Sequence, residues 1–460
     1  MDMAQIKNII KAQELKCIIV GTPDVNGNLR GRGIRPDHFI DCICDEGLGI
    51  CDCIYIMDTL DAMPLPSSSD LPWYPDWEGG YRDYFIRPDL DTFALVPWLE
   101  KTAMVIGDVY DQNTGELLET APRSLLKNLI ARAEGQGWQV QAASELEFVI
   151  LPESISQIAE KGFANIKKLS PGCYDYSCYR LAVHHELLEE IVQNMNQRGI
   201  DIHTYQVEAG GGQFELQLVH ADILKAADQA AIYKSGVKEM IARRGMTATF
   251  MAKYDPDSFG SSCHIHQSIT DKKTGANLFW DAGQEHNISK LMGHWAAGML
   301  AVMPDFTLMW APFVNSYKRY ADETAAGSGA SWGIDNRTVG VRVLPESESG
   351  CRLEHRVPGA DANPYLVLSA MLAGGLYGAE KKIEPPPLIK GNAYKASEEK
   401  VARVPRNLGD AIRSFRASPQ AKEYFGEKFA AYYAEYKAIE WQEFSLYVTD
   451  WEKRKYLEMV

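Results

Sequence analysis

The hydrophobic positions of the chain follow two patterns, and the change between them falls near residue 107. Before that point, short apolar runs at residues 17–20, 54–57 and 93–96 are separated by turn-forming residues. Such spacing is typical of strands in a small sheet-rich domain. We therefore predict a first domain at residues 1–107 and a larger second domain at 108–460.

Beyond residue 107, stretches with apolar residues at helical spacing alternate with runs of strand character. Helices are predicted at residues 3–14 in the first domain and at 123–134, 181–198, 221–244, 288–303 and 364–381 in the second. Strands are predicted in the second domain at residues 138–150, 202–208, 247–254, 263–268, 339–344 and 352–357. This inventory indicates an α+β protein whose mostly antiparallel sheet gathers polar residues on one face.

The strand predicted at 138–150 carries two carboxylates one residue apart. Because side chains alternate across a strand, Glu145 and Glu147 share one face while Leu146, Phe148 and Ile150 occupy the other. Carboxylates this close repel each other, and they lose solvation when they are buried. Nearby cations must therefore neutralise their charge unless the face is exposed to solvent. Taken alone, the pair fits a half-exposed strand with glutamates in solvent better than it fits a metal site.

Four further stretches place acids, imidazoles or guanidiniums at spacings that suit the same wall of a sheet. They are residues 207–215, 263–268, 335–342 and 352–356. Period-two spacing puts His264 on the same face as His266, and it does the same for the arginines and the glutamate of the last stretch. Hard oxygen ligands with one or two imidazoles suit Mg²⁺ or Mn²⁺, and arginines beside them suit phosphate. The repetition favours one shared site over separate structural roles.

Three consecutive glycines at 210–212 separate Glu208 from Glu215. They lead into a strand-like run rather than a helix N-terminus, and the chain contains no Gly-x-x-x-x-Gly-Lys-[Ser/Thr] segment. We therefore predict a tight hairpin that brings the two glutamates together, rather than a phosphate-binding loop.

Charge and composition narrow the class of protein. The 460 residues include 62 acidic and 47 basic ones, and the formal net charge of -15 disfavours nucleic acid or an anionic membrane as a partner. No apolar run reaches the length of a membrane span and no signal-like region opens the chain, so we expect a cytoplasmic protein. The odd number of cysteines, nine, favours reduced thiols, and we expect those at 42, 44, 51 and 53 to pack as small hydrophobes rather than to bind zinc.

The polar stretches, together with the segments 315–319 (NSYKR) and 362–366 (ANPYL), resemble the glutamine synthetase family from about residue 122 to the C-terminus. The resemblance implies a small N-terminal β-grasp-like domain and a large catalytic α/β domain with a curved antiparallel sheet. In that family ATP phosphorylates the γ-carboxylate of L-glutamate, and an amine then attacks the γ-glutamyl phosphate. The resemblance also implies two or more Mg²⁺ or Mn²⁺ ions per active site, and a ring-shaped dodecamer with active sites between subunits.

The resemblance assigns a role to each candidate residue. Six metal ligands are implied in two sets, Glu147, Glu208 and Glu215 for one ion and Glu145, His264 and Glu354 for the other. The first ion, with Glu147 and Glu208, would steady glutamate and the incoming amine, and the second would sit on the transferred phosphoryl group. The phosphate and the glutamate carboxylate would be held by Arg337, Arg342, Arg319 and Arg356. The remaining contacts would be Gly260 to substrate and His266, Ser268 and Arg352 to the nucleotide, with Asp58 reaching the site of the next subunit.

The segment between Arg319 and Asn336 departs from the family pattern. Members that use ammonia place there a glutamate that takes a proton from ammonium, whereas an equal-length count puts Ala325 at that position. Glu323 could replace it as a catalytic base. A smaller, uncharged residue leaves space for a substituent on nitrogen, and the tail at 448–456 resembles the branch of γ-glutamylpolyamine, γ-glutamylalkylamide and γ-glutamylanilide synthetases.

We therefore predict a ligase that joins glutamate to an amine larger than ammonia. Aromatic residues of the N-terminal loops would line the pocket of an alkyl or aromatic monoamine, and nearby acids would suit a polyamine. The aromatic candidates are Trp73, Tyr74, Trp77 and Tyr81, and the acidic ones are Asp70, Asp76, Glu78 and Asp83. Alternatives are glutamine synthesis from ammonia and a catalytically silent structural homologue, although a silent protein should have lost metal ligands that this chain retains.

Overall fold

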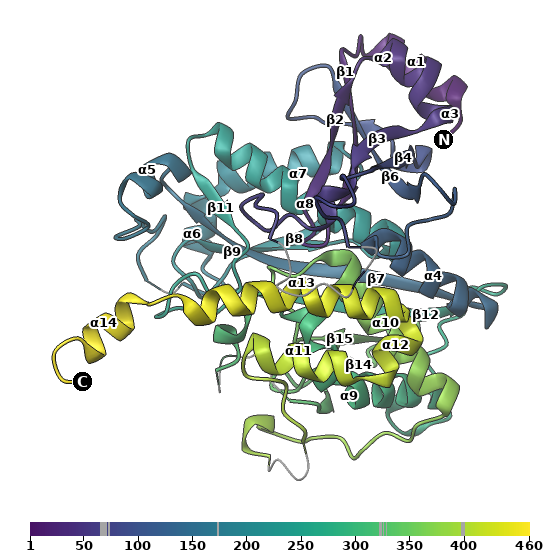
Figure 1. The fold of residues 1–460 in the computed structure, drawn as a ribbon. Coiled ribbons are helices and arrows are strands. Elements are labelled where there is room, and N and C mark those ends of the chain that lie inside the picture. Colours follow the sequence, from purple (N-terminus) through teal and green to yellow (C-terminus); the bar gives the residue numbers. More distant parts are fainter. Residues whose placement is uncertain are drawn as a thin grey trace.

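The computed structural model describes residues 1–64, 71, 74–172, 174–321, 324, 326–327, 329–396 and 401–460. Two sheets organise these residues, a smaller one formed by the N-terminal part of the chain and a larger one formed by the remainder (Figure 1). Helices and strands are combined as expected for the α+β class, which is confirmed. None of the described helices has the length and apolar character required to cross a bilayer.

The N-terminal sheet has the strand order β2-β1-β6-β4-β3, with β5 paired to β6. Its strands are β1 (Cys17–Pro23), β2 (Leu29–Ile34), β3 (Leu48–Cys51), β4 (Asp83–Pro88), β5 (Ala94–Leu95) and β6 (Thr102–Asp111). Its helical segments are α1 (Met3–Ala12), α2 (Pro36–His38), η1 (Phe39–Ile43), α3 (Cys44–Glu46), η2 (Asp52–Tyr55) and η3 (Leu90–Thr92). Because β6 pairs with β4 up to Asp111, this sheet continues past the domain limit expected at residue 107.

The strand predicted at 54–57 is wrong, because a short 3-10 helix, η2, occupies the first half of that run and a turn follows it. Ile54, Tyr55 and Ile56 are all buried, so the run lacks a polar face that would distinguish a strand from a helix. The thiol of Cys51 accepts a hydrogen bond from the backbone N–H of Cys53 at 3.4 Å and caps the helix start.

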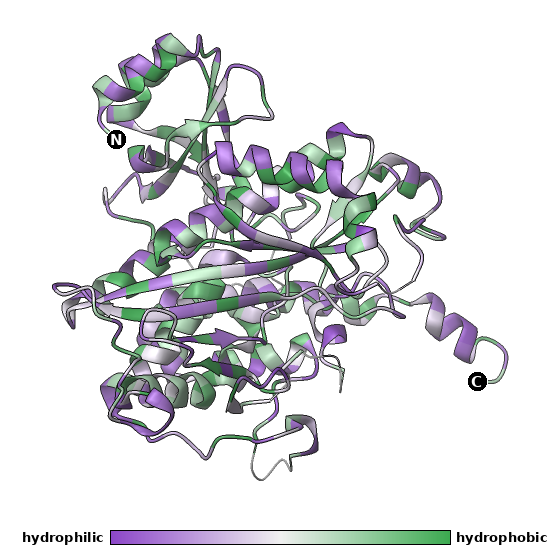
Figure 2. Cartoon of the chain, turned by 180° about the vertical axis from the view of Figure 1, so that it is seen from behind, coloured by the Kyte–Doolittle hydropathy of each residue, from purple (hydrophilic) through white to green (hydrophobic). Residues whose placement is uncertain are grey.

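The larger sheet has the order β13-β14-β15-β12-β7-β9-β8, and β10 and β11 also pair with β7. Its strands are β7 (Trp138–Leu151), β8 (Ile202–Val207), β9 (Gln213–Leu218), β10 (Ala221–Asp222), β11 (Thr247–Thr249), β12 (Cys263–Asp271), β13 (Trp332–Ile334), β14 (Val341–Leu344) and β15 (Arg352–His355). Neighbours are antiparallel except β13 and β14, as predicted. The long strands carry both hydrophilic and hydrophobic residues along their length (Figure 2).

Helices follow β6 along the chain. They are α4 (Pro122–Gly135), α5 (Ile155–Glu160), α6 (Cys178–Val183), α7 (His185–Gln197), α8 (Ile223–Arg243), α9 (Lys290–Trp310), α10 (Pro364–Lys381), α11 (Leu408–Ala417), α12 (Pro419–Phe425), α13 (Glu427–Leu446) and α14 (Asp450–Tyr456), with 3-10 turns η4 (Glu285–Asn287), η5 (Ser316–Arg319) and η6 (Ala393–Lys395). Two of them, α4 and α8, pack against β7 of this sheet. Leu146, Phe148 and Ile150 of β7 are fully buried, and the Phe148 ring lies 6.3 Å from that of Tyr233 on α8. The chain ends in α14, which projects from the body (Figure 1).

Three predicted elements differ from the structure in extent. The helix expected at 181–198 is two helices that meet at His184, and the strand expected at 247–254 ends at Thr249, where its pairing with β7 stops. The helix expected to end at residue 303 continues through Pro304 to Trp310. Proline costs about 3 kcal/mol inside a helix, and burial of the Phe306 and Trp310 side chains on the continuing turns offsets that cost.

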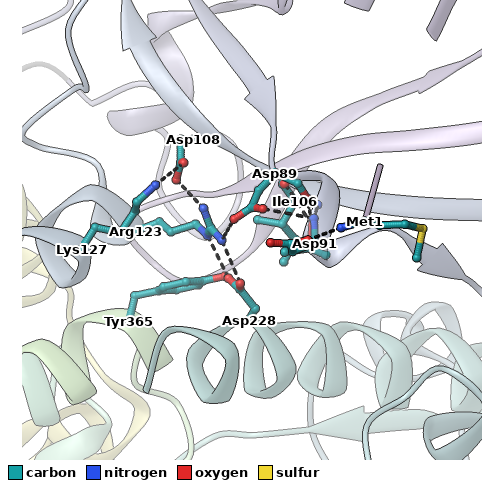
Figure 3. A network of polar contacts seen from close by, with 10 residues as sticks. Met1, Asp89, Asp91, Ile106, Asp108, Arg123, Lys127, Asp228 and Tyr365 are labelled. Atoms are coloured by element: carbon teal, nitrogen blue, oxygen red, sulfur yellow. Dashed lines mark hydrogen bonds and ion pairs between the residues drawn. The ribbon is translucent and has the colours of Figure 1, made fainter. Parts of the chain in front are cut away.

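A buried arginine joins the two parts of the molecule (Figure 3). Arg123, on α4, donates from Nε and Nη2 to the two carboxylate oxygens of Asp228 on α8, each at 3.0 Å. Its guanidinium also donates to Asp89 at 2.7 Å and to Asp108 on β6. The Tyr365 hydroxyl on α10 donates to Asp228 at 2.6 Å. One side chain thus holds the N-terminal sheet against the helices behind the larger sheet.

Replacement of Arg123 by methionine should therefore lower the free energy of unfolding by about 3–5 kcal/mol, because three carboxylates lose their common partner in a buried setting. Urea unfolding at fixed protein concentration measures this loss. Arg35→Met is the matched control, since Arg35 pairs with Asp37 on an exposed surface and its loss should cost less than about 0.5 kcal/mol. A cost below about 1 kcal/mol for Arg123→Met would contradict the role of this junction.

Candidate active site

The strand register brings the predicted acids and imidazoles onto one face of the larger sheet. Glu145 on β7 lies opposite His264 on β12, and Glu147 lies opposite Glu215 on β9. Residues opposite each other in antiparallel strands project to the same side, so the period-two prediction for β7 is confirmed. Their apolar neighbours on β7 fill the other side.

The same face continues across β15 and β14. Glu354 lies opposite His266 on one side and opposite Arg342 on the other. Arg342 Nη1 donates to Glu354 Oε2 at 3.0 Å, and Arg356 also donates to this carboxylate. Burial alone would raise the pKa of Glu354, but the charges of Arg356 and then His264 lower it below its usual range. A buried carboxylate is therefore kept ionised beside two guanidiniums.

The glycine-rich segment forms the predicted hairpin between β8 and β9. The backbone N–H of Glu208 donates to the carbonyl of Gln213 at 3.0 Å, which closes the turn. Gly212 adopts a φ of +81°, a left-handed conformation that favours glycine. Glu208 and Glu215 consequently line the same cavity.

That cavity has a volume of about 650 Å³ and collects most of the candidate residues. Those in its lining are Glu145, Glu147, Glu208, Glu215, Gly260, His264, Arg319, Arg337, Arg342, Glu354 and Arg356. The three nucleotide candidates, His266, Ser268 and Arg352, line a second cavity of about 270 Å³ together with Glu145. Glu145 borders both cavities, so they adjoin along β7.

Other candidates lie elsewhere or outside the described residues. Asp58 lines neither cavity, and its carboxylate accepts the backbone N–H groups of Leu60 and Ala62 at 2.7 and 2.9 Å. Its role in the site of a neighbouring subunit stays a prediction. Of the amine candidates, Tyr74 is 4% exposed and packs against Tyr432 in the core. The candidates Glu323, Ala325, Trp73 and Asp70 fall outside the residues that the structure describes.

The carboxylates of this face differ in their surroundings. Glu147 accepts hydrogen bonds from Gln213 Nε2 at 2.7 Å and from the backbone N–H of Ser262 at 3.0 Å. Burial would raise the pKa of Glu145, but close contact with the imidazoles of His264 and His266 holds it well below its usual range. His266 Nε2 lies 2.9 Å from Glu145 Oε1.

The pKa values of Glu208 and Glu215 are shifted upward, in the opposite direction to that of Glu145. Burial, and then the charge of Glu147, raises the pKa of Glu208 to about 7. Burial, and then the charges of Glu145, Glu147 and Glu208, raises the pKa of Glu215 to about 9. A divalent cation among these oxygens would relieve the repulsion.

Among the described residues, two groups could hold such an ion. One consists of Glu145, His266 and Glu354 and the other of Glu145, Glu215 and His264, with ligand atoms within 4.8 Å of one another in each group. Carboxylate oxygens with an imidazole fit Mg²⁺ or Mn²⁺. The groups differ from the expected sets, since Glu145 belongs to both and Glu147 and Glu208 to neither, and the division of ligands between two ions stays a prediction.

Comparison with known proteins agrees with this geometry. The sequence profile "Glutamine synthetase, catalytic domain" matches residues 119–456. The chain belongs to the glutamine synthetase family. A glutamate–isopropylamine ligase of Pseudomonas sp is 36% identical over 456 residues, which cover 99% of this chain and 98% of that protein.

Other members of the family are similar over the full chain. A γ-glutamylethanolamide synthetase of Streptomyces coelicolor is 32% identical over 462 residues, covering 100% of this chain and 96% of that protein. A glutamine synthetase of Thermotoga maritima is 30% identical, covering 99% of this chain and 100% of that protein. A solved structure described as a GmaS/ADP complex superposes with a TM-score of 0.85 at 27% identity, covering 99% of each chain.

Several residues of the glutamine synthetase-type cavity escaped the sequence analysis. Gln213 and Gln217 follow the period-two pattern of Glu215 on β9, so their place on this face was readable from spacing. Asp175, Tyr176 and Phe259 also line the cavity, but they come from loops. No periodicity marks loop residues, so only the folded structure shows them there.

The raised pKa values of Glu208 and Glu215 predict a pH-dependent metal affinity. The protonated forms cannot ligate, so the affinity for Mn²⁺ should rise as pH increases from about 6 to 9. Titration calorimetry at several pH values measures this rise. Glu215→Gln should weaken binding by at least about tenfold and flatten the profile.

Glu134→Gln supplies the control for that experiment, since Glu134 pairs with Lys272 on an exposed surface. It should leave the Mn²⁺ affinity unchanged. An affinity of the unmodified protein that does not vary over this pH range would contradict the electrostatic description of the site.

Proposed function

We propose that this chain is an ATP-dependent ligase that joins the γ-carboxylate of L-glutamate to an organic amine. The reaction would pass through γ-glutamyl phosphate and release a γ-glutamylamide, ADP and phosphate. The observation that carries the proposal is the single face on which carboxylates, imidazoles and guanidiniums line one cavity. Membership of the glutamine synthetase family supports the same reaction type.

Guanidinium groups in the cavity suit the charge of a phosphoryl group in transfer. Arg337, Arg342 and Arg356 all line it. Phosphoryl transfer spreads negative charge over oxygens, and planar donors at fixed positions stabilise that charge. Divalent ions, when bound, would add charge neutralisation and bridge phosphate oxygens.

Arg319 is suited to hold the glutamate carboxylate because two backbone carbonyls fix the position of its guanidinium group. Nη1 donates to the carbonyl of Val357 at 2.8 Å and Nη2 to that of Arg356 at 3.1 Å. Gly260 borders it so closely that a Cβ there would lie 2.6 Å from Arg319 Cγ. A rigid guanidinium beside a bare backbone makes a close-fitting subsite for a small substrate.

The smaller cavity suits ATP. Arg352 Nε donates to His266 Nδ1 at 3.1 Å, and both side chains line this cavity with Ser268. Since Glu145 borders both cavities, a nucleotide bound here could direct its terminal phosphate toward the carboxylate face. In-line transfer to glutamate requires this arrangement.

We infer that the amine is a small alkyl or aromatic monoamine. The relatives named for isopropylamine and ethanolamide support a primary monoamine over ammonia. We also infer a homo-oligomeric ring, a dodecamer with active sites between subunits, in which Asp58 contributes to the neighbouring site. A polyamine and ammonia are the alternative substrates.

The amine preference can be measured as phosphate release in the presence of ATP, Mg²⁺ and L-glutamate. Isopropylamine, ethanolamine, aniline, putrescine and ammonium should be compared at matched concentrations, with a control that lacks glutamate. We expect at least one monoamine to exceed ammonium by about tenfold or more in kcat/KM, since a site that accommodates the substituent gains its burial. A preference for ammonium would indicate a glutamine synthetase, and no turnover with any amine would indicate a silent homologue.

Arg337→Met tests the phosphoryl-transfer role. The side chain lines the catalytic cavity, and its loss should lower kcat by about 10²–10³-fold with a small change in the KM for glutamate. Arg413→Met is the control, because Arg413 pairs with Asp410 on the exposed face of α11 and should leave turnover unchanged. An unchanged kcat in Arg337→Met would remove this residue from the reaction.

A further inference from the structure

A third cavity, of about 590 Å³, lies where the turn between β1 and β2 meets α8 and the end of β11. It shares no lining residue with the catalytic cavity or with the cavity assigned to ATP. Its charged lining residues are Lys234, Lys238 and Asp361. Nothing in the proposed reaction uses it.

The two lysines are one helical turn apart on α8 and face the same ring. The ammonium of Lys234 lies 5.6 Å from the centre of the Phe250 ring, and that of Lys238 lies 5.8 Å from it. Residues four apart on a helix share a face, so like charges here repel each other. Burial, and then the charge of Lys238, lowers the pKa of Lys234 to about 8.

Neither ammonium is neutralised by an ion pair within the part of the chain that the structure describes. Lys234 is 6% exposed, and its single hydrogen bond there goes from Nζ to the carbonyl of Ala362 at 2.8 Å. An ammonium has three N–H donors, so two remain for another acceptor. The acid whose charge acts on Lys238, Asp24, is itself bonded to Arg30 at 2.8 Å.

Asp361 does not cancel the two cations. One of its carboxylate oxygens accepts a hydrogen bond from the Ser316 hydroxyl at 2.6 Å, and burial raises its pKa. The lining therefore carries two lysines against one carboxylate, which has one oxygen engaged by Ser316. Lys234 is buried and Lys238 is exposed, so the cost of a buried cation without a counter-ion falls on Lys234, and a bound anion would remove it.

The remainder of the lining mixes polar residues with a group of apolar side chains. Phe250, Met251 and Phe313 border the cavity, and Met251 is 42% exposed. An inorganic anion would contact the lysines alone. An organic anion would also pack its apolar part against these side chains. The combination of a cationic end and an aromatic wall is typical of sites for small organic acids.

We propose that this cavity binds a small organic carboxylate, with its carboxylate group between Lys234 and Lys238 and its apolar part against Phe250, Met251 and Phe313. The site is separate from the glutamate, amine and nucleotide sites of the proposed ligase, and it does not depend on that function. The ligand class follows from the two unpaired ammonium groups and the apolar wall beside them.

Titration calorimetry with benzoate tests the proposal on the full-length protein. We expect one benzoate per chain, with binding weakened by at least about tenfold in Lys234→Met and in Lys238→Met, because each variant removes a charged hydrogen-bond donor. Lys225→Met is the matched control, since Lys225 is an exposed lysine of the same helix outside the cavity, and it should bind as the unmodified protein does. Thermal unfolding of each variant checks that it is folded, and Lys238→Met carries the test if Lys234→Met is not.

Two further probes separate the parts of the proposal. Benzamide, the neutral counterpart of benzoate, should bind at least about tenfold more weakly, and so should inorganic phosphate. Equal binding of benzamide would overturn the cationic half, and equal binding of phosphate would overturn the apolar half. Benzoate binding unchanged in Lys238→Met would place the ligand elsewhere and overturn the site.

Discussion

Repulsion among carboxylates on one sheet face is the constraint on which the structure of the site depends. Glu145, Glu147, Glu208 and Glu215 border one cavity, and their charges act on one another through a partly buried environment. Such an arrangement persists only if the backbone that carries it cannot relax. The apolar face of β7 supplies that rigidity, because Phe148 packs against Phe214, Tyr233 and Phe250 on the opposite side.

The response of each carboxylate to this repulsion indicates its local role. Glu145 keeps a low pKa because two imidazoles contact it, and Glu354 because guanidiniums do. Glu208 and Glu215 form no ion pair with the described residues, and burial and their acidic neighbours raise the pKa of both. On one part of the face, cationic side chains of the chain already neutralise the carboxylates. The other part requires an added cation, as expected where a metal ion and phosphate meet.

Rigidity is also needed between the two sheets. Arg123 contacts Asp89, Asp108 and Asp228, which lie in the N-terminal region, on β6 and on α8 (Figure 3). Burial of a guanidinium and its acids is unfavourable by itself, so this junction contributes specificity of docking more than net stability. Removing one partner would nevertheless leave the others buried and unpaired.

The sequence predicted which polar residues share one sheet face more accurately than it predicted some of the elements that support that face. On β7, β12 and β15, side chains alternate between the two faces, so strand geometry alone predicts which residues share a face. The strands then pair so that their apolar faces lie on the same side. Run 54–57 was assigned wrongly because burial on all sides removes the periodic signal, and the end of α9 was missed because packing of Phe306 and Trp310 outweighs a local proline signal. The hydrophobic pattern identifies an element where one of its faces is exposed to solvent. It gives a weak signal where the segment is wholly buried.

The loops that border the catalytic cavity are the part of it about which the sequence pattern gives least information. In the proposed reaction the sheet face would supply charge for phosphoryl transfer, and that chemistry would be the same whichever amine attacks. Asp175, Tyr176 and Phe259 reach the same cavity from loops, where side-chain direction depends on tertiary contacts rather than on a repeat. Under the proposed function, a sheet with a fixed register would support one reaction while the loops around it select the nucleophile, so strand periodicity identifies the reaction class more readily than the amine.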